Sequence, residues 1–203
     1  MSSLNSIAAV ESGQKRVHSR IVRFLNSLGA NGVVFVKPFE NSQKIELFFV
    51  EKGVRIVGRS RVFILPEMLS CIYDFSDIAS RRSFDYARLL ERYLSADSQV
   101  VLFTHLPSQG DPQEELRKLA GVGHPFDAES SSFRGRLWQE RKNGGAFASH
   151  AWLDGAVAES GSSLTVLEKN MIANGLHVPD DSTELLRHLN AIGVRRLQAG
   201  LFT

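Results

Sequence analysis

The chain has 203 residues, of which 43% are hydrophobic and 23% charged, and its formal net charge at pH 7 is +2. These ordinary values exclude a disordered chain, a collagen-like repeat and a bare coiled coil. The single cysteine, Cys71, cannot form a disulfide within the chain, which favours a reducing compartment. No apolar run approaches the about 18 residues that a membrane-spanning helix needs. The first residues also lack the pattern of a secretory signal, so we expect a cytoplasmic protein without a membrane partner.

Charge is distributed unevenly along the chain. Residues 1–66 contain 10 basic and 4 acidic residues, residues 67–128 contain 6 and 10, and residues 129–203 contain 8 of each. A basic first third either binds a polyanion or complements the acidic middle of the same chain.

The first predicted element is an amphipathic helix over residues 14–28 that ends at Gly29. Its basic residues lie off an apolar stripe formed by Val17, Ile21, Phe24 and Leu28. Residues 33–65 then predict an antiparallel meander, with strands at 33–36, 44–51, 54–57 and 61–65. Period-two alternation in this meander places three arginines on one face: Arg55, Arg59 and Arg61.

Three helices and one strand are predicted between residues 66 and 121. The helices begin at Pro66, at the N-cap Ser83 and at Asp111-Pro112, and the last of them ends at Gly121. Residues 99–104 (QVVLFT) form the strongest strand pattern and are expected to be buried on both faces of a sheet.

Residues 121–163 are the least regular stretch of the sequence. The Asn143-Gly144-Gly145 turn favours a β-hairpin, and two short helices are the alternative. Two helices are predicted to follow, one from Ser163 to Asn174-Gly175 and one from Asp181 or Ser182 to Gly193.

Together these elements predict an α+β fold. A mostly antiparallel sheet of four to five strands would be covered by the N-terminal helix, and the C-terminal third would be largely helical. We expect residues 1–125 to form a core domain and residues 126–203 a mostly helical region, either separate or part of the same domain.

One candidate catalytic pattern consists of Asp127, Glu140 and Lys142. An acidic residue followed by an acid-x-Lys pattern occurs in metal-dependent nucleases, in which two carboxylates hold a divalent cation and the lysine acts beside the phosphate. The default interpretation is a solvated charged hairpin, because charged residues are common and the spacing is loose.

Other chemical patterns are weaker. His150 and Asp154 would share a helix face, but no further ligand lies at zinc-site spacing, so we expect no metal site. Cys71 is expected to be a buried thiol on an apolar stripe. The sequence contains no nucleophile elbow, P-loop or dinucleotide-binding fingerprint, and no cofactor is expected.

The two C-terminal helices resemble a winged helix-turn-helix in outline. Its second helix would present its polar side to the major groove of DNA, with Thr183, Arg187, His188 and Asn190. A plain helical hairpin packed on the domain is favoured instead, because acidic residues precede the second helix and would face phosphates.

The leading functional hypothesis is a non-enzymatic cytoplasmic binding or regulatory protein. Its basic surface would engage nucleic acid or an acidic protein by charge neutralisation. The alternatives are a metal-dependent nuclease or phosphodiesterase, and a structural subunit of an assembly, including a homo-oligomer. The residues of the predicted basic surface are Lys15, Arg16, Arg20, Arg23, Arg55, Arg59 and Arg61.

Overall fold

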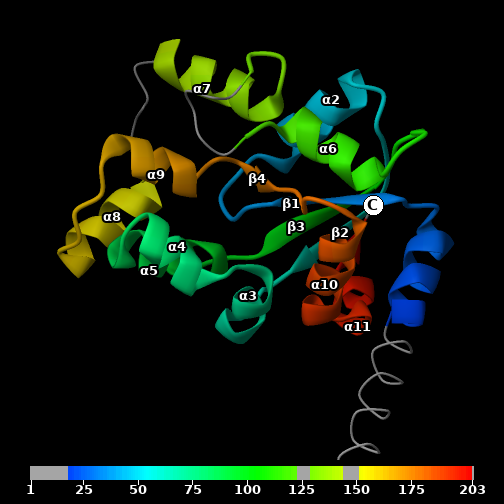
Figure 1. Ribbon diagram of the computed structural model, residues 1–203, viewed down its shortest axis with the longest axis horizontal. Helices are drawn as coiled ribbons and strands as arrows, with labels where there is room; N and C mark the ends of the chain where they lie inside the picture. Colours follow the sequence, from blue (N-terminus) through cyan, green and yellow to red (C-terminus); the bar gives the residue numbers. More distant parts are fainter. Residues whose placement is uncertain (1–17, 123–128, 144–150, 203) are drawn as a thin grey trace, which may run out of the picture.

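The computed structural model describes residues 18–122, 129–143 and 151–202 (Figure 1). Within these ranges, no helix has the length and apolar character needed to cross a membrane.

Five antiparallel strands form one sheet with the order β4-β1-β3-β2-β5. The strand β1 lies between β3 and β4, and its Val34 is paired with Leu102 of β3. The strand bounds are Gly32–Val36 (β1), Arg55–Val62 (β2), Gln99–His105 (β3), Leu176–His177 (β4) and Leu201–Phe202 (β5).

The order in which the chain visits the sheet defines the topology. The helix α2 (Ser42–Glu51) connects β1 to β2, and α6 (Pro112–Ala120) is the first helix between β3 and β4. This strand-helix-strand, strand-helix-strand path with β1 and β3 central is the ferredoxin-like arrangement. The predicted α+β class with a mostly antiparallel sheet of four to five strands is confirmed.

The remaining helices are inserted between strands or follow the sheet. Three of them separate β2 from β3, and the others form the largely helical C-terminal third that the sequence predicts. Their bounds are Pro66–Ile72 (α3), Phe75–Arg81 (α4), Phe84–Ser95 (α5), Phe133–Asn143 (α7), Ala151–Ser160 (α8), Val166–Ile172 (α9), Ser182–Ile192 (α10) and Val194–Ala199 (α11).

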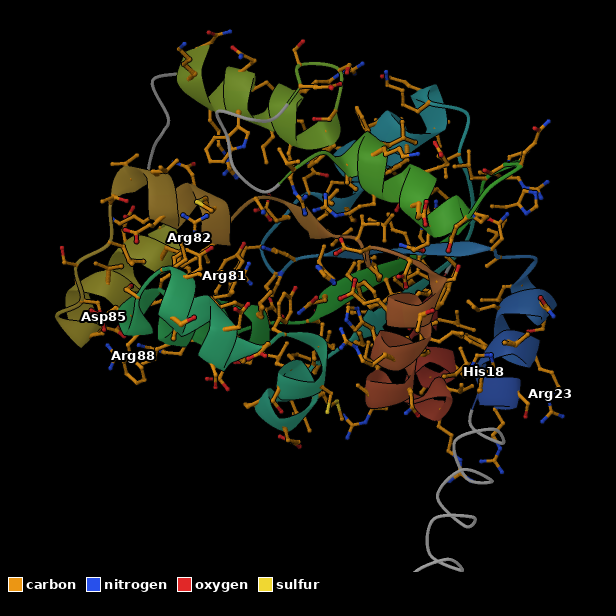
Figure 2. All side chains as sticks on the ribbon, viewed as in Figure 1. His18, Arg23, Arg81, Arg82, Asp85 and Arg88 are labelled. Atoms are coloured by element: carbon orange, nitrogen blue, oxygen red, sulfur yellow. The ribbon has the colours of Figure 1, made fainter. Side chains whose placement is uncertain are left out.

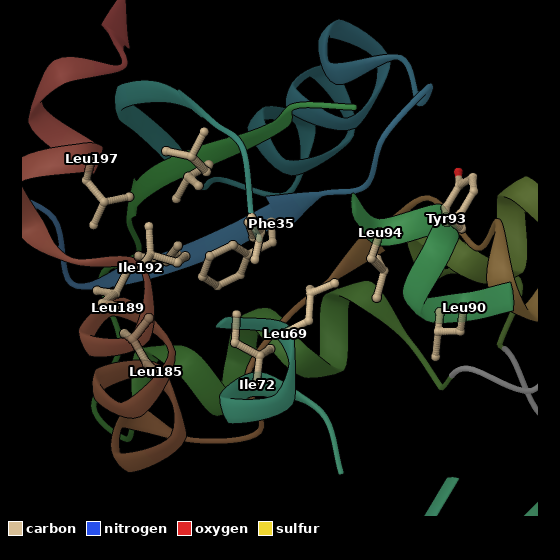
Figure 3. Close-up of a cluster of buried hydrophobic side chains, with 14 of the residues drawn as sticks. Phe35, Leu69, Ile72, Leu90, Tyr93, Leu94, Leu185, Leu189, Ile192 and Leu197 are labelled. Atoms are coloured by element: carbon tan, nitrogen blue, oxygen red, sulfur yellow. The ribbon is translucent and has the colours of Figure 1, made fainter. Parts of the chain in front are cut away.

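The two faces of the sheet carry separate hydrophobic cores. Alternation along β1 sends Val34 and Val36 to one face, where they pack with α2, α6 and α7, and Val33 and Phe35 to the other. The second core contains the N-terminal helix (residues 18–28), whose Phe24 packs edge-on against Phe103 of β3, together with α3, α5, α10 and α11 (Figure 3). The predicted N-terminal helix therefore covers the sheet.

Three local predictions are wrong. Residues 44–51 form a helix, because Asn41 caps its first turn and Ile45, Phe48 and Phe49 are buried at helical spacing. In the described part of residues 121–163 the chain forms the helices α7 and α8, so the favoured hairpin is wrong and the alternative of two helices is confirmed. Cys71 is exposed, since it lies on the outer side of the short helix α3.

Candidate functional site

A cavity of about 580 Å³ lies beside the β4–β1 edge of the sheet. Its walls come from segments far apart in the sequence: the end of β1, the helices α3 to α5, α7, and the chain from α9 into β4. We call this cavity the His177 pocket. The residues that line it are Lys37, Tyr73, Ile78, Arg81, Arg82, Tyr86, Leu90, Arg134, Met171, Asn174, Leu176 and His177.

Lys37 and His177 are brought together where β1 ends and β4 begins. The amide of Lys37 donates to the carbonyl of Gly175 at 3.1 Å, and Phe35 is paired with His177 across the two strands. Gly175 has a φ of +90°, and a Cβ there would lie 2.7 Å from a ring carbon of Phe133. Only glycine combines this backbone conformation with this close approach.

Lys37 is a buried cation, with only 6% of its surface exposed. Its Nζ donates to the carbonyl of Ile172 at 2.9 Å. Burial, together with the positive charge of Arg134, lowers the pKa of Lys37 from 10.5 to about 7. A bound anion would reverse much of this shift, because it would favour the charged ammonium.

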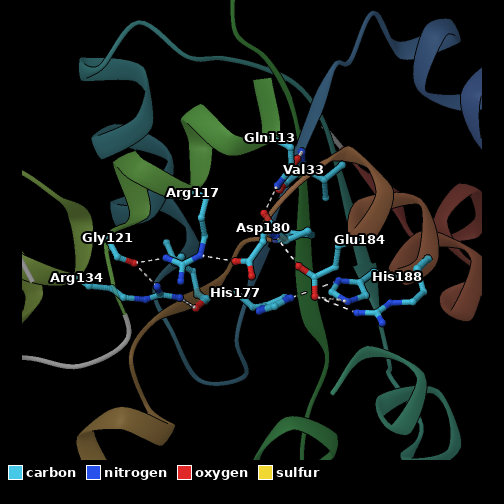
Figure 4. A network of polar contacts seen from close by, with 12 residues as sticks. Val33, Gln113, Arg117, Gly121, Arg134, His177, Asp180, Glu184 and His188 are labelled. Carbon is cyan, nitrogen blue, oxygen red and sulfur yellow. Dashed lines mark hydrogen bonds and ion pairs between the residues drawn. The ribbon is translucent and has the colours of Figure 1, made fainter. Parts of the chain in front are cut away.

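Arg134 is the second buried cation of the pocket. Its guanidinium donates to the carbonyls of Gly121 and Leu176, the latter at 2.9 Å (Figure 4). Burial lowers the pKa of Arg134 to about 9, so it stays charged at neutral pH. In the part of the chain that the structure describes, neither Arg134 nor Lys37 forms an ion pair with a carboxylate.

The His177 ring is enclosed by other rings. Its centroid lies 5.1 Å from Tyr73, 5.1 Å from His188 and 6.0 Å from Phe35. Burial and the neighbouring positive charges hold the pKa of His177 well below 6.5, so the imidazole is neutral at pH 7. Its Nε2 lies 3.3 Å from Nδ1 of His188, which leaves Nδ1 of His177 as the ring nitrogen available to the pocket.

The opposite wall combines cationic and aromatic groups. Arg81 and Arg82 lie at the end of α4, at the other end of the molecule from Arg23 (Figure 2). Burial raises the pKa of Tyr86 to about 12 and also raises that of Tyr73, so both phenols remain neutral hydrogen-bonding groups.

The charge balance of the pocket is one-sided. Four of its described lining residues are Lys or Arg, and none is Asp or Glu. Lysine and arginine bind phosphate oxygens through charge-assisted hydrogen bonds, and arginine does so with two parallel donors. The arrangement can therefore hold a phosphate group beside an imidazole nitrogen of His177.

The residues of the predicted basic surface do not form one free patch. Arg59 forms a bidentate ion pair with Glu46, with Nη2 to Oε2 at 2.7 Å, and Arg61 lies 5.5 Å above the ring of Phe202. Arg55 is exposed on β2, and Arg20 and Arg23 are on the N-terminal helix. Lys15 and Arg16 lie outside the described residues.

The nuclease pattern is not assembled as expected. Glu140 and Lys142 lie on α7 rather than at the end of a strand, Glu140 is ion-paired with Lys44, and Asp127 lies outside the described residues. Asp154 pairs with Lys169 at 2.6 Å, and its proposed companion His150 is also outside the described ranges. Among the residues that the structure describes, no group of three His, Cys, Asp or Glu could hold a metal ion.

The helix-turn-helix interpretation is also wrong. The strand β4 lies between α9 and α10, and the side chain of His188, a predicted base-reading residue, is fully buried. Sequence reasoning missed Lys37, Arg134, Asn174 and His177. The sequence did contain one signal for Lys37. This lysine directly follows the apolar run VVFV, and that run contains no acidic residue that could pair with it.

Comparisons with known proteins concern the fold. No protein-family model and no curated protein matches the sequence. Among solved structures, a nucleoside-diphosphate kinase from Borrelia burgdorferi with bound vanadate and ADP is similar, with a TM-score of 0.52 and 18% identity over 81% of this chain and 88% of that chain.

Two further kinases are similar at the same level. The enzyme from Encephalitozoon cuniculi has a TM-score of 0.50 and 16% identity, covering 80% of this chain and 87% of that one. The Halobacterium salinarum enzyme in complex with CDP has a TM-score of 0.50 and 15% identity, covering 84% and 90%.

These similarities correct the functional hypothesis. The similar structures named above are nucleoside-diphosphate kinases, which are enzymes. The non-enzymatic binding hypothesis and its nuclease alternative are therefore overturned. The chain has the fold of nucleoside-diphosphate kinases.

Proposed function

We propose that the protein transfers phosphoryl groups between nucleotides, with His177 as the group that is phosphorylated. The observation that carries the proposal is a pocket lined by four cationic side chains and no described carboxylate, with a neutral histidine on its wall. The ligands in the titles of similar structures, ADP, CDP and vanadate, suggest the class of substrate.

The chemistry follows from the ring nitrogen that faces the pocket. The lone pair of His177 Nδ1 attacks the terminal phosphorus of a nucleoside triphosphate, and an N–P bond forms as the P–O bond to the nucleoside diphosphate breaks. The bond electrons leave with the bridging oxygen of the diphosphate. A second nucleoside diphosphate then attacks the phosphohistidine with its terminal oxygen, which regenerates the free imidazole.

Lys37 and Arg134 would stabilise the charge on the phosphoryl oxygens during transfer. Both are buried, and hydrogen bonds to main-chain carbonyls hold them in place before substrate arrives. Donors fixed in this way act strongly in a water-poor site, since little reorganisation is needed during the reaction. Asn174 adds a neutral polar group to the same wall.

The nucleoside would lie toward the helical wall. Ile78, Tyr86 and Leu90 give that wall an apolar surface for a base or sugar, and Arg81 and Arg82 lie beside it. Since apolar contacts to a ring do not distinguish one base from another, we expect broad base tolerance.

The experiment is a labelling assay with ATP carrying ³²P in the γ-position and Mg²⁺. We expect protein-bound label that is stable to alkali and labile to acid, as a phosphoramidate is. The label should move to added CDP. His177→Asn should abolish labelling.

The matched control is His105→Gln, which removes a half-buried histidine whose Nδ1 lies 3.2 Å from the carbonyl of Gly29, away from the pocket. It should label like the unaltered protein. Label that persists in His177→Asn would refute the assignment. Binding of ATP without any labelling would refute phosphoryl transfer.

A further inference from the structure

Behind the His177 pocket, three side chains lie in a polar row that ends at a partly exposed carboxylate (Figure 4). Nε2 of His177 on β4 lies 3.3 Å from Nδ1 of His188 on α10. Nε2 of His188 in turn lies 3.3 Å from Oε1 of Glu184, one helical turn earlier, which is an ion-pair distance without hydrogen-bond geometry. The carboxylate therefore reaches the pocket histidine only through a second, fully buried imidazole.

Glu184 is fixed from two sides. Its Oε2 accepts the amide hydrogen of Asp180 at 2.5 Å, and its Oε1 accepts from Nη2 of Arg187 at 3.1 Å. These contacts orient the carboxylate so that Oε1 faces His188. The negative charge of this carboxylate favours the hydrogen of His188 on Nε2, the ring nitrogen that faces it, although the two groups are not in hydrogen-bond geometry.

The position of that hydrogen determines the tautomer of both rings. Burial holds the pKa of His188 at about 4, so the ring is neutral at pH 7 and carries one hydrogen. With that hydrogen on Nε2, the Nδ1 atom of His188 is an acceptor. Its neighbour, Nε2 of His177, must then be the donor, which leaves the lone pair of His177 on Nδ1.

The packing favours this neutral arrangement of the rings. Phe35 and Tyr73 flank His177, and Phe35 also contacts the edge of His188, with centroids 6.2 Å apart. The nearby cations Lys37 and Arg134 further disfavour a charged His177. Between two neutral rings, either His177 Nε2 donates to His188 Nδ1 or His188 Nδ1 donates to His177 Nε2. The charge of Glu184 favours the first arrangement.

We propose that His188 is a positioning residue that, with Glu184, holds His177 as the tautomer with hydrogen on Nε2 and a free lone pair on Nδ1 toward the pocket. This inference rests on the proposed function for its purpose, since Nδ1 is the atom assigned to phosphorylation. Its structural content, the tautomer, can be measured without any turnover.

The direct test is ¹⁵N NMR of the histidine rings in the full chain at pH 7.5. The chemical shifts of the two ring nitrogens identify which one carries hydrogen, and His177→Asn identifies the His177 signals. In the unaltered protein we expect hydrogen on Nε2 of His177. In His188→Leu this preference should be lost. The side chain of His188→Asn can still offer an acceptor near the position of His188 Nδ1, so this variant should partly restore the preference for hydrogen on Nε2 of His177.

Glu184→Gln gives a second test at a residue that is partly exposed. The main-chain donor at Asp180 should keep the amide oxygen at the Oε2 position, which places the NH₂ group toward His188 once the exposed Arg187 side chain turns away into solvent. His188 would then accept at Nε2 and donate from Nδ1, and His177 would carry its hydrogen on Nδ1. Unchanged His177 shifts in both Glu184→Gln and His188→Leu would overturn the proposal, even if either variant also lowered activity.

Kinetics separate this inference from the proposed function. If transfer occurs, His188→Leu should lower kcat about tenfold to a hundredfold, as loss of a partner that orients a functional histidine does, with little change in KM. His188→Asn should recover part of the loss. The protein could show the expected ¹⁵N shifts of His177 and still transfer no phosphoryl group. That outcome would support the role of His188 and refute only the proposed function.

Discussion

The affinity of the His177 pocket for a nucleoside diphosphate should depend on pH through Lys37. In the free protein burial lowers the pKa of Lys37 to about 7, so most molecules lack this charge at pH 8. A bound phosphate group favours the ammonium form, and binding above pH 7 therefore takes up a proton.

The size of the effect follows from the free-protein pKa. Above pH 7 each pH unit should weaken binding by up to tenfold, or about 1.4 kcal/mol. Between pH 7.5 and 8.5 the weakening should be about eightfold. The phosphate groups of ADP do not titrate in this range, because the pKa of the terminal phosphate is about 6.

Calorimetry with ADP at several pH values measures this directly. Two buffers of different ionisation enthalpy should reveal an uptake approaching one proton at pH 8.5. Lys37→Arg keeps a charged group throughout and should bind with nearly constant affinity. Lys118→Arg, at an exposed lysine paired with Glu115, should behave like the unaltered protein. A pH-independent affinity, or an equal slope in Lys37→Arg, would refute the assigned role of Lys37.

Three further predictions concern stability. Lys37→Met should raise the free energy of unfolding of the ligand-free protein at pH 7, because the cost of burying the ammonium exceeds the attraction of nearby Glu40. The same variant should weaken ADP binding, and urea denaturation and calorimetry measure the two effects. The pKa values of His177 and His188 are lower than in the unfolded chain, so the free energy of unfolding should fall as the pH drops below 6.5. The expected slope is about 1.4 kcal/mol per pH unit for each ring. Urea denaturation at pH 7 and pH 5, repeated with His188→Leu, measures this slope. Gly175→Ala should cost about 2–4 kcal/mol through its positive φ and the clash with Phe133, measured by thermal and urea unfolding.

Local signals predicted much of the fold. The caps Ser83, Asp111 and Asp181 each accept a main-chain hydrogen bond as expected, at distances of 2.8–3.0 Å, because capping depends on a few adjacent residues. The apolar strand at 99–104 is central in the sheet, since a strand buried on both faces has a continuous apolar pattern.

The errors arose where two patterns coincide. Residues 44–51 combine strand-forming residues with helical spacing, and tertiary burial of Ile45, Phe48 and Phe49 against the sheet decided for the helix. The strands β4 and β5 have two residues each, which is too short for any periodicity. His177 lies in one of them, so its role could not be read from local pattern.

Counting charges along the chain favoured a different surface from the one that lines the His177 pocket. The count gives equal weight to Arg59, which Glu46 neutralises, and to Lys37 and Arg134, which have no carboxylate partner in the described ranges. The exposed charges are screened by water, whereas the buried pair is costly in the free protein. A phosphate group that enters the pocket removes part of that cost. Ligand binding should therefore stabilise the fold more at pH 7 than at pH 9, where Lys37 has already lost its proton.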